Sequence, residues 1–475
     1  MQRSVAMVTM GCSRNDVDSE ELASRLSAAG WTIVADADGA TAVIVNTCGF
    51  IDAAKKDSID TILALADGDR PVVAVGCMAE RYGRELAEAL DEAHAVLGFD
   101  DYPQIAERLT AIVAGERLPA HEPRDRRLML PVTPLDRPSA PGHQPGHGQT
   151  ADTASPGWQP PVLRYRLDDS PIAPVKLASG CDRRCTFCAI PTFRGAFVSR
   201  PAADVMAEIA WLADQGVREA VLVSENSTSY GKDLGDPALL ERMLAGVADT
   251  GITRVRVAYL QPAEVRPGLI DALAGTSAVA AYFDLSFQHA SESVLRRMRR
   301  FGGGGDFLGL LERVRDVAPT AGVRSNVIVG FPGETEQDLE VLCDFLGAAR
   351  LDAIGVFGYS DEEGTQAAAL DGKLSPGEIA DRVGHVSALA ETLMAERAEE
   401  RIGETVRVIV LGPDEDGEGW LGRADHQGPD DGAVHLAPSD VVRGSVRRGV
   451  VEACDGPDLF VSTHSDDDSR DPTPR

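Results

Sequence analysis

Hydrophobic residues in the first quarter of the chain gather in short runs that alternate with helical stretches. The runs Val5–Met10, Ala42–Val45 and Pro71–Val75 have the length and composition of buried strands. Helical stretches such as Asp18–Ala29 lie between them. Strands that alternate with helices predict βαβ units around a parallel sheet. We therefore predict an amino-terminal domain of this class over residues 1–116.

The same alternation returns over residues 172–400 with more repeats. Amphipathic helices such as Ala202–Gln215 and Thr335–Ala349 separate its apolar runs. The runs predict six strands, at 174–179, 220–224, 255–259, 282–287, 323–330 and 353–359. Six β/α units predict a partial (β/α)6 barrel, and the active sites of such barrels lie at the carboxyl ends of the strands.

The pattern differs in three other segments. Residues 117–171 include a stretch with ten prolines among Gly, Ser and Thr, which predicts a linker or flexible insertion. Residues 401–466 hold short β-like runs between Gly, Pro and Asp turns, which is typical of a small antiparallel β-barrel. Residues 467–475 predict a disordered acidic tail. The expected fold class is therefore an α/β multidomain protein.

Three of the eight cysteines lie in one short loop, SGCDRRCTFCAIP, directly after the first predicted barrel strand. Cys181, Cys185 and Cys188 can bind three corners of a 4Fe-4S cluster and leave the fourth iron open to a cofactor or substrate. A structural zinc site needs a fourth ligand. The next cysteine is Cys343, and no histidine occurs between residues 148 and 288, so the zinc alternative is disfavoured.

Three further cysteines each follow a predicted strand of the amino-terminal domain. Cys12, Cys48 and Cys77 would thus meet at one rim of a parallel sheet, where ligands usually bind. The alternative is that they are buried apolar residues, as free cysteines often are, but their parallel placement favours a second cluster. Cys343 and Cys454 lie in apolar segments without such partners and are interpreted as core residues.

Several polar and aromatic residues lie close to these cysteines in the sequence. Phe187 directly precedes the third loop cysteine, where its ring would either pack against a purine or fill the core. Ser224 and Glu225 end the second barrel strand and would reach polar groups of a cofactor. The segment Asn15–Glu20 fits either a helix cap or a place beside the first cysteine group.

Composition narrows the classes of partner and compartment. The formal charge is 46 minus 75, or −29, which disfavours nucleic acid as the main ligand and attracts basic partners. Acidity that only keeps the protein soluble is the alternative. Eight cysteines are too sparse for a disulfide scaffold. Since no apolar run suits a membrane span or a signal peptide, we expect a cytoplasmic protein.

The spacing Cys-x3-Cys-x-aromatic-Cys after the first barrel strand resembles that of the radical S-adenosylmethionine enzymes. The resemblance implies that the open iron binds S-adenosylmethionine, whose reductive cleavage gives a radical that removes hydrogen from a substrate. The runs TMGCSRNDVDSE, NTCGF and GC at 76–77 resemble the methylthiotransferases within this superfamily. That likeness implies that Cys12, Cys48 and Cys77 hold an auxiliary 4Fe-4S cluster carrying the sulfur to be methylated and donated.

The resemblance covers nearly the whole chain, including a carboxy-terminal TRAM-like barrel. Runs such as FDLSFQHAS and GRADHQGPDDG resemble the branch that modifies an aspartate of the small-subunit ribosomal protein S-twelve. The resemblance implies that the substrate is ribosomal protein S-twelve, either free or in the assembling small subunit. It also implies a reductase and a sulfur donor as further partners. Direct RNA binding should not dominate, because residues 401–475 carry 8 Arg, no Lys and 16 acidic residues. The alternatives are a tRNA adenosine methylthiotransferase and a non-catalytic iron-sulfur electron carrier.

Overall fold

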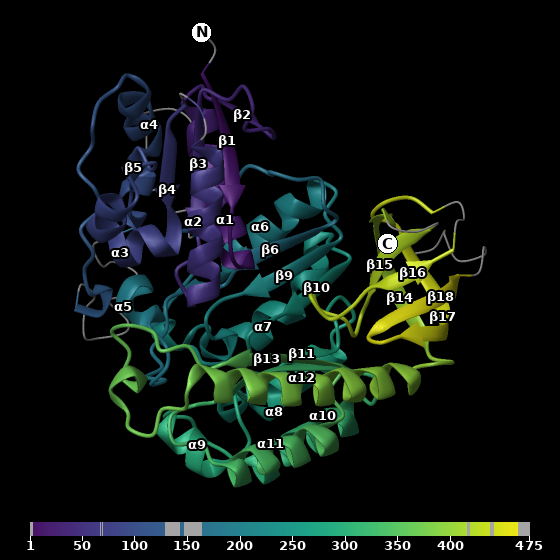
Figure 1. Cartoon of the computed structure of the whole chain (residues 1–475). Coiled ribbons are helices and arrows are strands. Elements are labelled where there is room, and N and C mark those ends of the chain that lie inside the picture. Colours follow the sequence, from purple (N-terminus) through teal and green to yellow (C-terminus); the bar gives the residue numbers. More distant parts are fainter. Residues whose placement is uncertain are drawn as a thin grey trace.

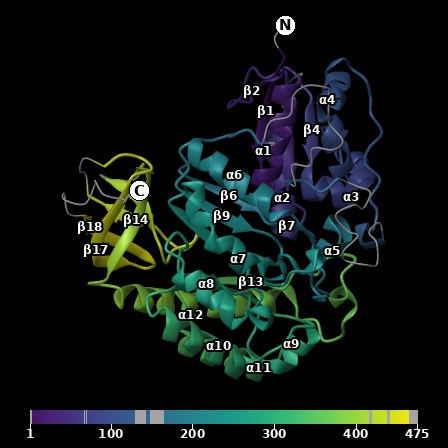
Figure 2. The ribbon, with the colours of Figure 1, turned by 180° about the vertical axis from the view of Figure 1, so that it is seen from behind.

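The computed structural model arranges the chain in three parts, shown from opposite sides in Figures 1 and 2. In Figure 1 the amino-terminal domain (purple and blue) lies above the barrel (teal and green), and the small carboxy-terminal barrel (yellow) lies at the right. The tail predicted over 467–475 and most of the predicted insertion lie outside the described residues. The structure describes residues 3–66, 68, 70–128, 143–146, 164–415, 419–437 and 441–463.

The amino-terminal domain is the predicted parallel sheet with helices on both faces. Its strand order is β2-β1-β3-β4-β5. Helices α1 and α4 share one buried cluster with the sheet, and α2 and α3 share the cluster on the other face. The elements are β1 (Ser4–Thr9), α1 (Ser13–Ala28), β2 (Thr32–Val34), β3 (Ala42–Thr47), α2 (Asp52–Leu65), β4 (Val72–Val75), α3 (Gly76–Ala89), β5 (Ala95–Val96) and α4 (Ile105–Val113).

The central part is the predicted partial barrel. Two parallel three-stranded sheets, β6-β9-β10 and β11-β12-β13, meet through isolated bridges such as that between Leu260 and Leu285. One large apolar cluster fills the space between these strands and the surrounding helices. The strands are β6 (Ile172–Lys176), β9 (Glu219–Val223), β10 (Arg254–Val257), β11 (Tyr282–Asp284), β12 (Gly322–Val329) and β13 (Ala353–Gly358).

Helices cover the outer side of this barrel, and a two-stranded sheet of β7 (Ala178–Ser179) and β8 (Val198–Ser199) flanks the cysteine loop. None of the described helices is both long and apolar enough to cross a membrane. The helices are α5 (Ile190–Arg194), α6 (Ala202–Asp214), α7 (Leu239–Ala245), α8 (Pro267–Gly275), α9 (Glu292–Arg297), α10 (Gly304–Val317), α11 (Glu336–Ala349) and α12 (Pro376–Glu399).

The carboxy-terminal part is a closed five-stranded barrel in the order β14-β15-β16-β18-β17. The predicted antiparallel pairing holds for all of its pairs except β16 with β18, which are parallel. Cys343 in α11 and Cys454 in β17 lie partly buried at the margins of their apolar cores. The strands are β14 (Thr405–Pro413), β15 (Trp420–Ala424), β16 (Val434–Leu436), β17 (Val446–Asp455) and β18 (Asp458–Thr463).

The predicted linker over 117–171 is packed where the structure describes its middle. Pro145 and Gly146 are buried rather than exposed. The His143 ring places its Nε2 2.9 Å from a Glu21 carboxylate oxygen in α1, and the His143 backbone N–H donates to Asp100 Oδ1 at 2.9 Å. This piece of the insertion is therefore anchored to the amino-terminal domain.

Two buried arginines of β10 join the central barrel to the carboxy-terminal one. Arg254 and Arg256 both pair with Glu219 of β9, and all three side chains are fully buried. Arg256 donates to the backbone carbonyl of Ala424 at 3.2 Å, and Arg254 donates to that of Arg423 at 3.1 Å. Glu219 is thus the buried counter-charge that both arginines share, and Arg254 pairs with Asp425 as well.

We expect this junction to weaken in acid. Burial disfavours the Glu219 carboxylate, but Arg254 and Arg256 outweigh burial and lower its pKa from 4.5 to about 2. A depressed folded-state pKa contributes stability that is present above about pH 4.5 and is lost as the pH falls toward 2. The contribution is roughly 3 kcal/mol at neutral pH.

The measurement is urea unfolding between pH 7 and pH 2 for the wild-type chain and for Glu219→Gln. The difference between their unfolding free energies should shrink as the pH falls from 4.5 to 2. Asp60→Asn, which removes an exposed carboxylate paired only with Lys56 in the same helix, provides the matched control. A difference that stays constant over this range would contradict the assignment.

Candidate functional site

Cys12, Cys48 and Cys77 lie side by side at one rim of the amino-terminal sheet. They follow β1, β3 and β4, which are neighbours in the sheet and parallel. Cys12 is the residue before α1, and Cys77 lies in the first turn of α3. Burial raises the pKa of the Cys77 thiol to about 11, and the charges of Cys12 and Cys48 add to that rise. The three sulfurs therefore share one electrostatic environment.

Glycines let the three backbones approach each other. Gly11 has φ of +98°, and a Cβ built on it would lie 2.9 Å from Cys48 Cβ. Gly76 has φ of +92°, and a Cβ there would lie 2.7 Å from the carbonyl oxygen of Thr47. A positive φ is costly for every residue except glycine, because only glycine lacks a Cβ. The close packing also leaves no room for a Cβ at either position. The glycine that precedes Cys12 and the one that precedes Cys77 are thus needed by the geometry.

The second cysteine group lies in the loop between β7 and α5. Cys181, Cys185 and Cys188 line one pocket of about 430 Å³. Burial raises the pKa of the Cys188 thiol to about 12, and the charge of Cys185 adds to it. The backbone N–H of Arg183 donates to Cys181 Sγ at 3.4 Å. Other residues that line the pocket are Arg127, Asp182, Arg184, Pro191, Thr192, Ala196, Arg299, Gly364, Thr365 and Gln366.

Neither cysteine group forms a site for a single metal ion in the described part of the chain. Within the described part of the chain, no three His, Cys, Asp or Glu side chains converge closely enough to hold one metal ion. A tetrahedral zinc site needs ligands about 2.0 to 2.3 Å from one centre. The ligands of a cubic cluster instead bind separate irons, so their sulfurs stand farther apart. The assignment of the two three-cysteine groups to 4Fe-4S clusters therefore stays a prediction, based on the sequence and on the chemistry of thiolate ligands.

Phe187 packs in the core rather than in the pocket. Its ring is partly buried against an apolar cluster that includes Val294, Met298 and Phe331. It is not among the residues that line the pocket of the loop cysteines. The structure thus places the Phe187 ring beside this core cluster, and the purine-stacking role stays a prediction.

Ser224 and Glu225 have different surroundings at the end of β9. The Ser224 hydroxyl is engaged locally, since it accepts from the backbone N–H of Asn226 at 3.1 Å and lies 3.1 Å from the Ser227 hydroxyl. The Glu225 side chain is 1% exposed, and neither carboxylate oxygen has a hydrogen-bond partner. Its charge is compensated by Arg14 and Arg194, whose Nε atoms each lie 3.7 Å from one carboxylate oxygen. Because both of its oxygens lack a hydrogen bond, Glu225 has more free acceptor capacity than Ser224, and a cofactor-binding role for either residue stays a prediction.

The segment Asn15–Glu20 lies inside α1 and does not cap it. The helix begins at Ser13, and the preceding Cys12 makes no side-chain capping bond. Asn15 and Asp18 are instead buried at the domain boundary. The capping alternative is therefore wrong, because the helix starts earlier than the apolar pattern predicts, directly after the cysteine.

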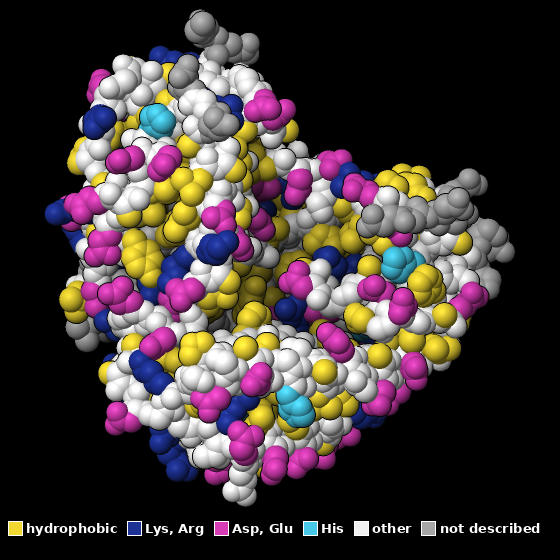
Figure 3. Space-filling model, viewed as in Figure 1, with side chains coloured by type: hydrophobic (Ala, Val, Ile, Leu, Met, Phe, Trp, Pro, Cys, Tyr) yellow, Lys and Arg dark blue, Asp and Glu magenta, His cyan; other side chains and the backbone are white. Residues whose placement is uncertain are grey.

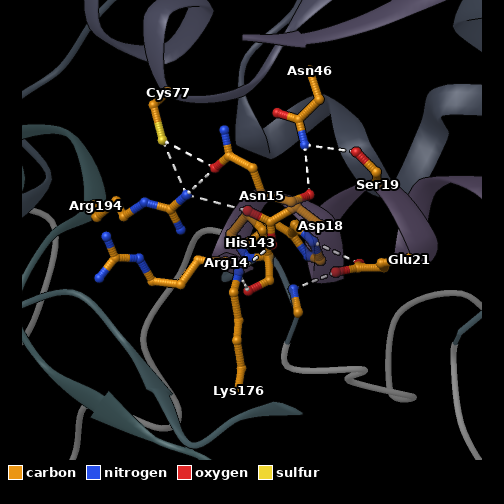
Figure 4. A network of polar contacts seen from close by, with 12 residues as sticks. Arg14, Asn15, Asp18, Ser19, Glu21, Asn46, Cys77, His143, Lys176 and Arg194 are labelled. Carbon is orange, nitrogen blue, oxygen red and sulfur yellow. Dashed lines mark hydrogen bonds and ion pairs between the residues drawn. The ribbon is translucent and has the colours of Figure 1, made fainter. Parts of the chain in front are cut away.

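Arg194 of α5 is the site residue that the sequence analysis did not single out. Figure 4 shows its guanidinium beside Cys77 and Asn15. Its Nη2 has two hydrogens, which Cys77 Sγ at 3.0 Å, Asn15 Oδ1 at 3.1 Å and Asp18 Oδ2 at 3.2 Å share as acceptors. Lys176 of β6 pairs with the other oxygen of Asp18. Arg194 lies six residues after Cys188, the last cysteine of the loop, and no local pattern marked it as a site residue.

The two arginines of this site favour thiolates. Burial opposes ionisation of the Cys12 thiol, but the charges of Arg14 and Arg194 prevail and lower its pKa. Burial likewise disfavours the charged form of Arg194, yet the negative charges of Cys77 and Asp18 raise its pKa well above the ordinary value. Thiolates are the form in which cysteine binds metals. The arginines thus outweigh burial at Cys12, whereas burial prevails at Cys48 and Cys77 and raises the pKa of both thiols.

Comparison with known proteins assigns the family. The chain matches the uncharacterized protein family UPF0004 over residues 4–98 and the radical SAM superfamily over residues 175–346. The protein named ribosomal protein uS12 methylthiotransferase RimO from Saccharopolyspora erythraea is 59% identical, over 97% of this chain and 95% of that protein. The protein of the same name from Nocardioides sp. is 60% identical, over 96% of each. This chain belongs to the RimO family.

Each of the two matched regions contains one of the cysteine groups. The UPF0004 match spans Cys12, Cys48 and Cys77, and the radical SAM match spans the three loop cysteines. A solved structure of the radical S-adenosylmethionine methyltransferase TsrM from Kitasatospora setae resembles this chain with a TM-score of 0.51. It is 17% identical, covers 75% of this chain and 72% of its own, and therefore shows the fold alone.

Proposed function

We propose that this chain is a radical S-adenosylmethionine methylthiotransferase that modifies the β-carbon of an aspartate of ribosomal protein uS12. The relatives named for this activity are about 60% identical over nearly the whole chain. The observation that carries the proposal is that the two cysteine groups meet at one domain boundary. Arg194 contacts Cys77 Sγ, and the same arginine lies 3.7 Å from Glu225, whose charge also acts on Cys188.

The residues of the two groups are suited to the implied cofactors. Cys12, Cys48 and Cys77 would hold the auxiliary 4Fe-4S cluster, and Cys181, Cys185 and Cys188 would hold the radical cluster. When bound, the cofactors supply the methyl group and the radical chemistry that replaces a carbon–hydrogen bond of the aspartate by a carbon–sulfur bond. The Glu225 carboxylate, buried and without a hydrogen-bond partner, would accept from the amino group of S-adenosylmethionine.

The charge of the chain supports a basic protein substrate. The net charge of −29 favours encounter with a basic ribosomal protein and opposes a polyanion such as tRNA. The three parts of the chain meet around a hollow on the face seen in Figure 3. A pocket of about 210 Å³ lies where they meet, with lining residues from each part that include Ser13, Val221 and Leu411. We place uS12, alone or in the assembling subunit, against this face.

The remaining partners follow from the chemistry. Reductive cleavage of S-adenosylmethionine consumes an electron, so a reductase must supply it, and the inserted sulfur must come from a sulfur donor. We expect both to act with the enzyme in the cytoplasm. These partners are part of the proposal and rest on the reaction rather than on a surface of the chain.

The test offers both candidate substrates to the reconstituted full-length chain. Purified uS12, small subunits and tRNA are incubated separately with S-adenosylmethionine, dithionite and sulfide, and the products are analysed by mass spectrometry. We expect one methylthio group on an aspartate of uS12 and none on tRNA adenosine. Modified tRNA with unmodified uS12 would assign the chain to the tRNA branch. Bound clusters without cleavage of S-adenosylmethionine would indicate an electron carrier.

A further inference from the structure

Two arginines cross the boundary between the amino-terminal domain and the barrel in opposite directions. Arg14 of α1 reaches into the barrel, where its Nη1 donates to the backbone carbonyl of Ser224 at 3.1 Å. Arg194 of α5 reaches out of the barrel to Cys77. The Nε atoms of both lie 3.7 Å from the same Glu225 oxygen. The boundary is therefore built around a shared carboxylate between two guanidinium groups.

Arg194 is oriented by the domain to which it does not belong. Its side chain is 3% exposed, and Asn15 and Asp18 accept hydrogen bonds from the same Nη2 that contacts Cys77 Sγ. The guanidinium carbon also lies 5.2 Å from the centre of the Phe99 ring. Asn15, Asp18 and Phe99 all belong to the amino-terminal domain. A planar guanidinium held on one face by a ring and along one edge by acceptors has little freedom to turn.

The bond from Arg194 to Cys77 has a chemical consequence for a cluster held there. A hydrogen bond donated to a ligand sulfur withdraws electron density from it and stabilises the reduced, more negative cluster. The reduction potential of the cluster therefore rises. Lys176 does not take this role, because its ammonium group pairs with Asp18 and with the carbonyl oxygen of Pro145.

We propose that Arg194 is a positioning residue that sets the reduction potential of the auxiliary cluster through its hydrogen bond to Cys77. Arg194 belongs to α5, which follows directly on the Cys181–Cys188 loop. A residue of the barrel domain therefore adjusts the reduction potential of the cluster in the amino-terminal domain. The inference rests on the proposed function, since it requires a cluster at Cys12, Cys48 and Cys77.

The experiment isolates the auxiliary cluster in the full-length chain. Replacing Cys181, Cys185 and Cys188 by alanine removes the other cluster, and the remaining one is reconstituted with iron and sulfide. In this background Arg194→Gln and Arg194→Lys are compared with the parent. Arg25→Gln is the matched control, since Arg25 is a buried arginine of α1 that pairs with Glu21. The readouts are iron and sulfide content, circular dichroism, and the midpoint potential from redox titration followed by electron paramagnetic resonance.

We expect Arg194→Gln to load iron and to titrate at a lower potential than the parent. At a fixed potential the ratio of reduced to oxidised cluster should fall about tenfold, which equals about 59 mV for a one-electron couple. Arg194→Lys, which keeps a positive donor, should recover part of this shift, and Arg25→Gln should leave the potential unchanged.

Two results would overturn the inference. One is a loaded cluster in Arg194→Gln with the potential of the parent. The other is loss of the folded circular dichroism spectrum in both Arg194 variants, which would make the residue a structural one. Failure of the proposed function is read separately, from the products formed on uS12 and on tRNA, except where the parent binds no iron at its remaining cysteines. That last result would overturn both proposals.

Discussion

Cys185→Ala is expected to abolish methylthiolation of uS12 and to remove about half of the bound iron. Cys185 is the middle residue of the loop group, and its sulfur shares the pocket with those of Cys181 and Cys188. Two thiolates do not hold a cluster that needs three, so one of two 4Fe-4S clusters is lost. The loss of activity should exceed the roughly 10- to 100-fold typical of outer-shell changes at metal sites.

The measurement combines iron content, cleavage of S-adenosylmethionine and mass spectrometry of uS12. Cys343→Ala is the matched control, because Cys343 lies partly buried in α11 beside an apolar core. It should keep full iron content and activity. Modified uS12 from Cys185→Ala would show that the radical chemistry does not depend on this loop.

Asp18→Asn is expected to destabilise the folded chain by about 3–5 kcal/mol, because it leaves buried positive charge without its counterion. Asp18 pairs with Lys176, and both side chains are fully buried. Arg194 donates to the second Asp18 oxygen at 3.2 Å. Desolvation already lowers the Lys176 pKa, and Asp18 is a neighbouring charge that opposes this. Removing the carboxylate should therefore free two cations at the domain boundary.

Urea unfolding followed by circular dichroism and by tryptophan fluorescence measures this effect. The double variant Asp18→Asn with Lys176→Met should recover part of the loss, since one unpaired cation is gone. Asp60→Asn removes an exposed ion pair and should cost less than about 1 kcal/mol. A cost for Asp18→Asn as small as that of the control would contradict the buried-network assignment.

Site residues could be predicted from the sequence where they lie directly after a predicted strand. Cys12, Cys48 and Cys77 could be placed together because each follows an apolar run, and neighbouring parallel strands end at one rim. The barrel and its cysteine loop could be predicted for the same reason. Periodicity reports which face of an element is buried, and in a layered domain that is enough to order the layers.

Contacts across the domain boundary could not be predicted in this way. Arg194 and Cys77 are 117 residues apart, and no local pattern relates them. The start of α1 was misplaced because Cys12 offers no capping side chain to recognise. Phe187 could be assigned only once Val294 and Phe331 were known to lie beside it. These features depend on how separately folded layers dock.

The two ends of the incomplete barrel are both attached to the amino-terminal domain. Beside β6, Lys176 is buried against Asp18 of α1. In the loop that follows β13, Glu362 accepts from Lys55 at 3.0 Å and from Arg81 at 2.9 Å. An open sheet has two unpaired edges that invite aggregation. The amino-terminal domain therefore also protects the barrel from self-association at these edges. A recombinant fragment that begins at residue 172 should precipitate under conditions in which the full chain stays in solution.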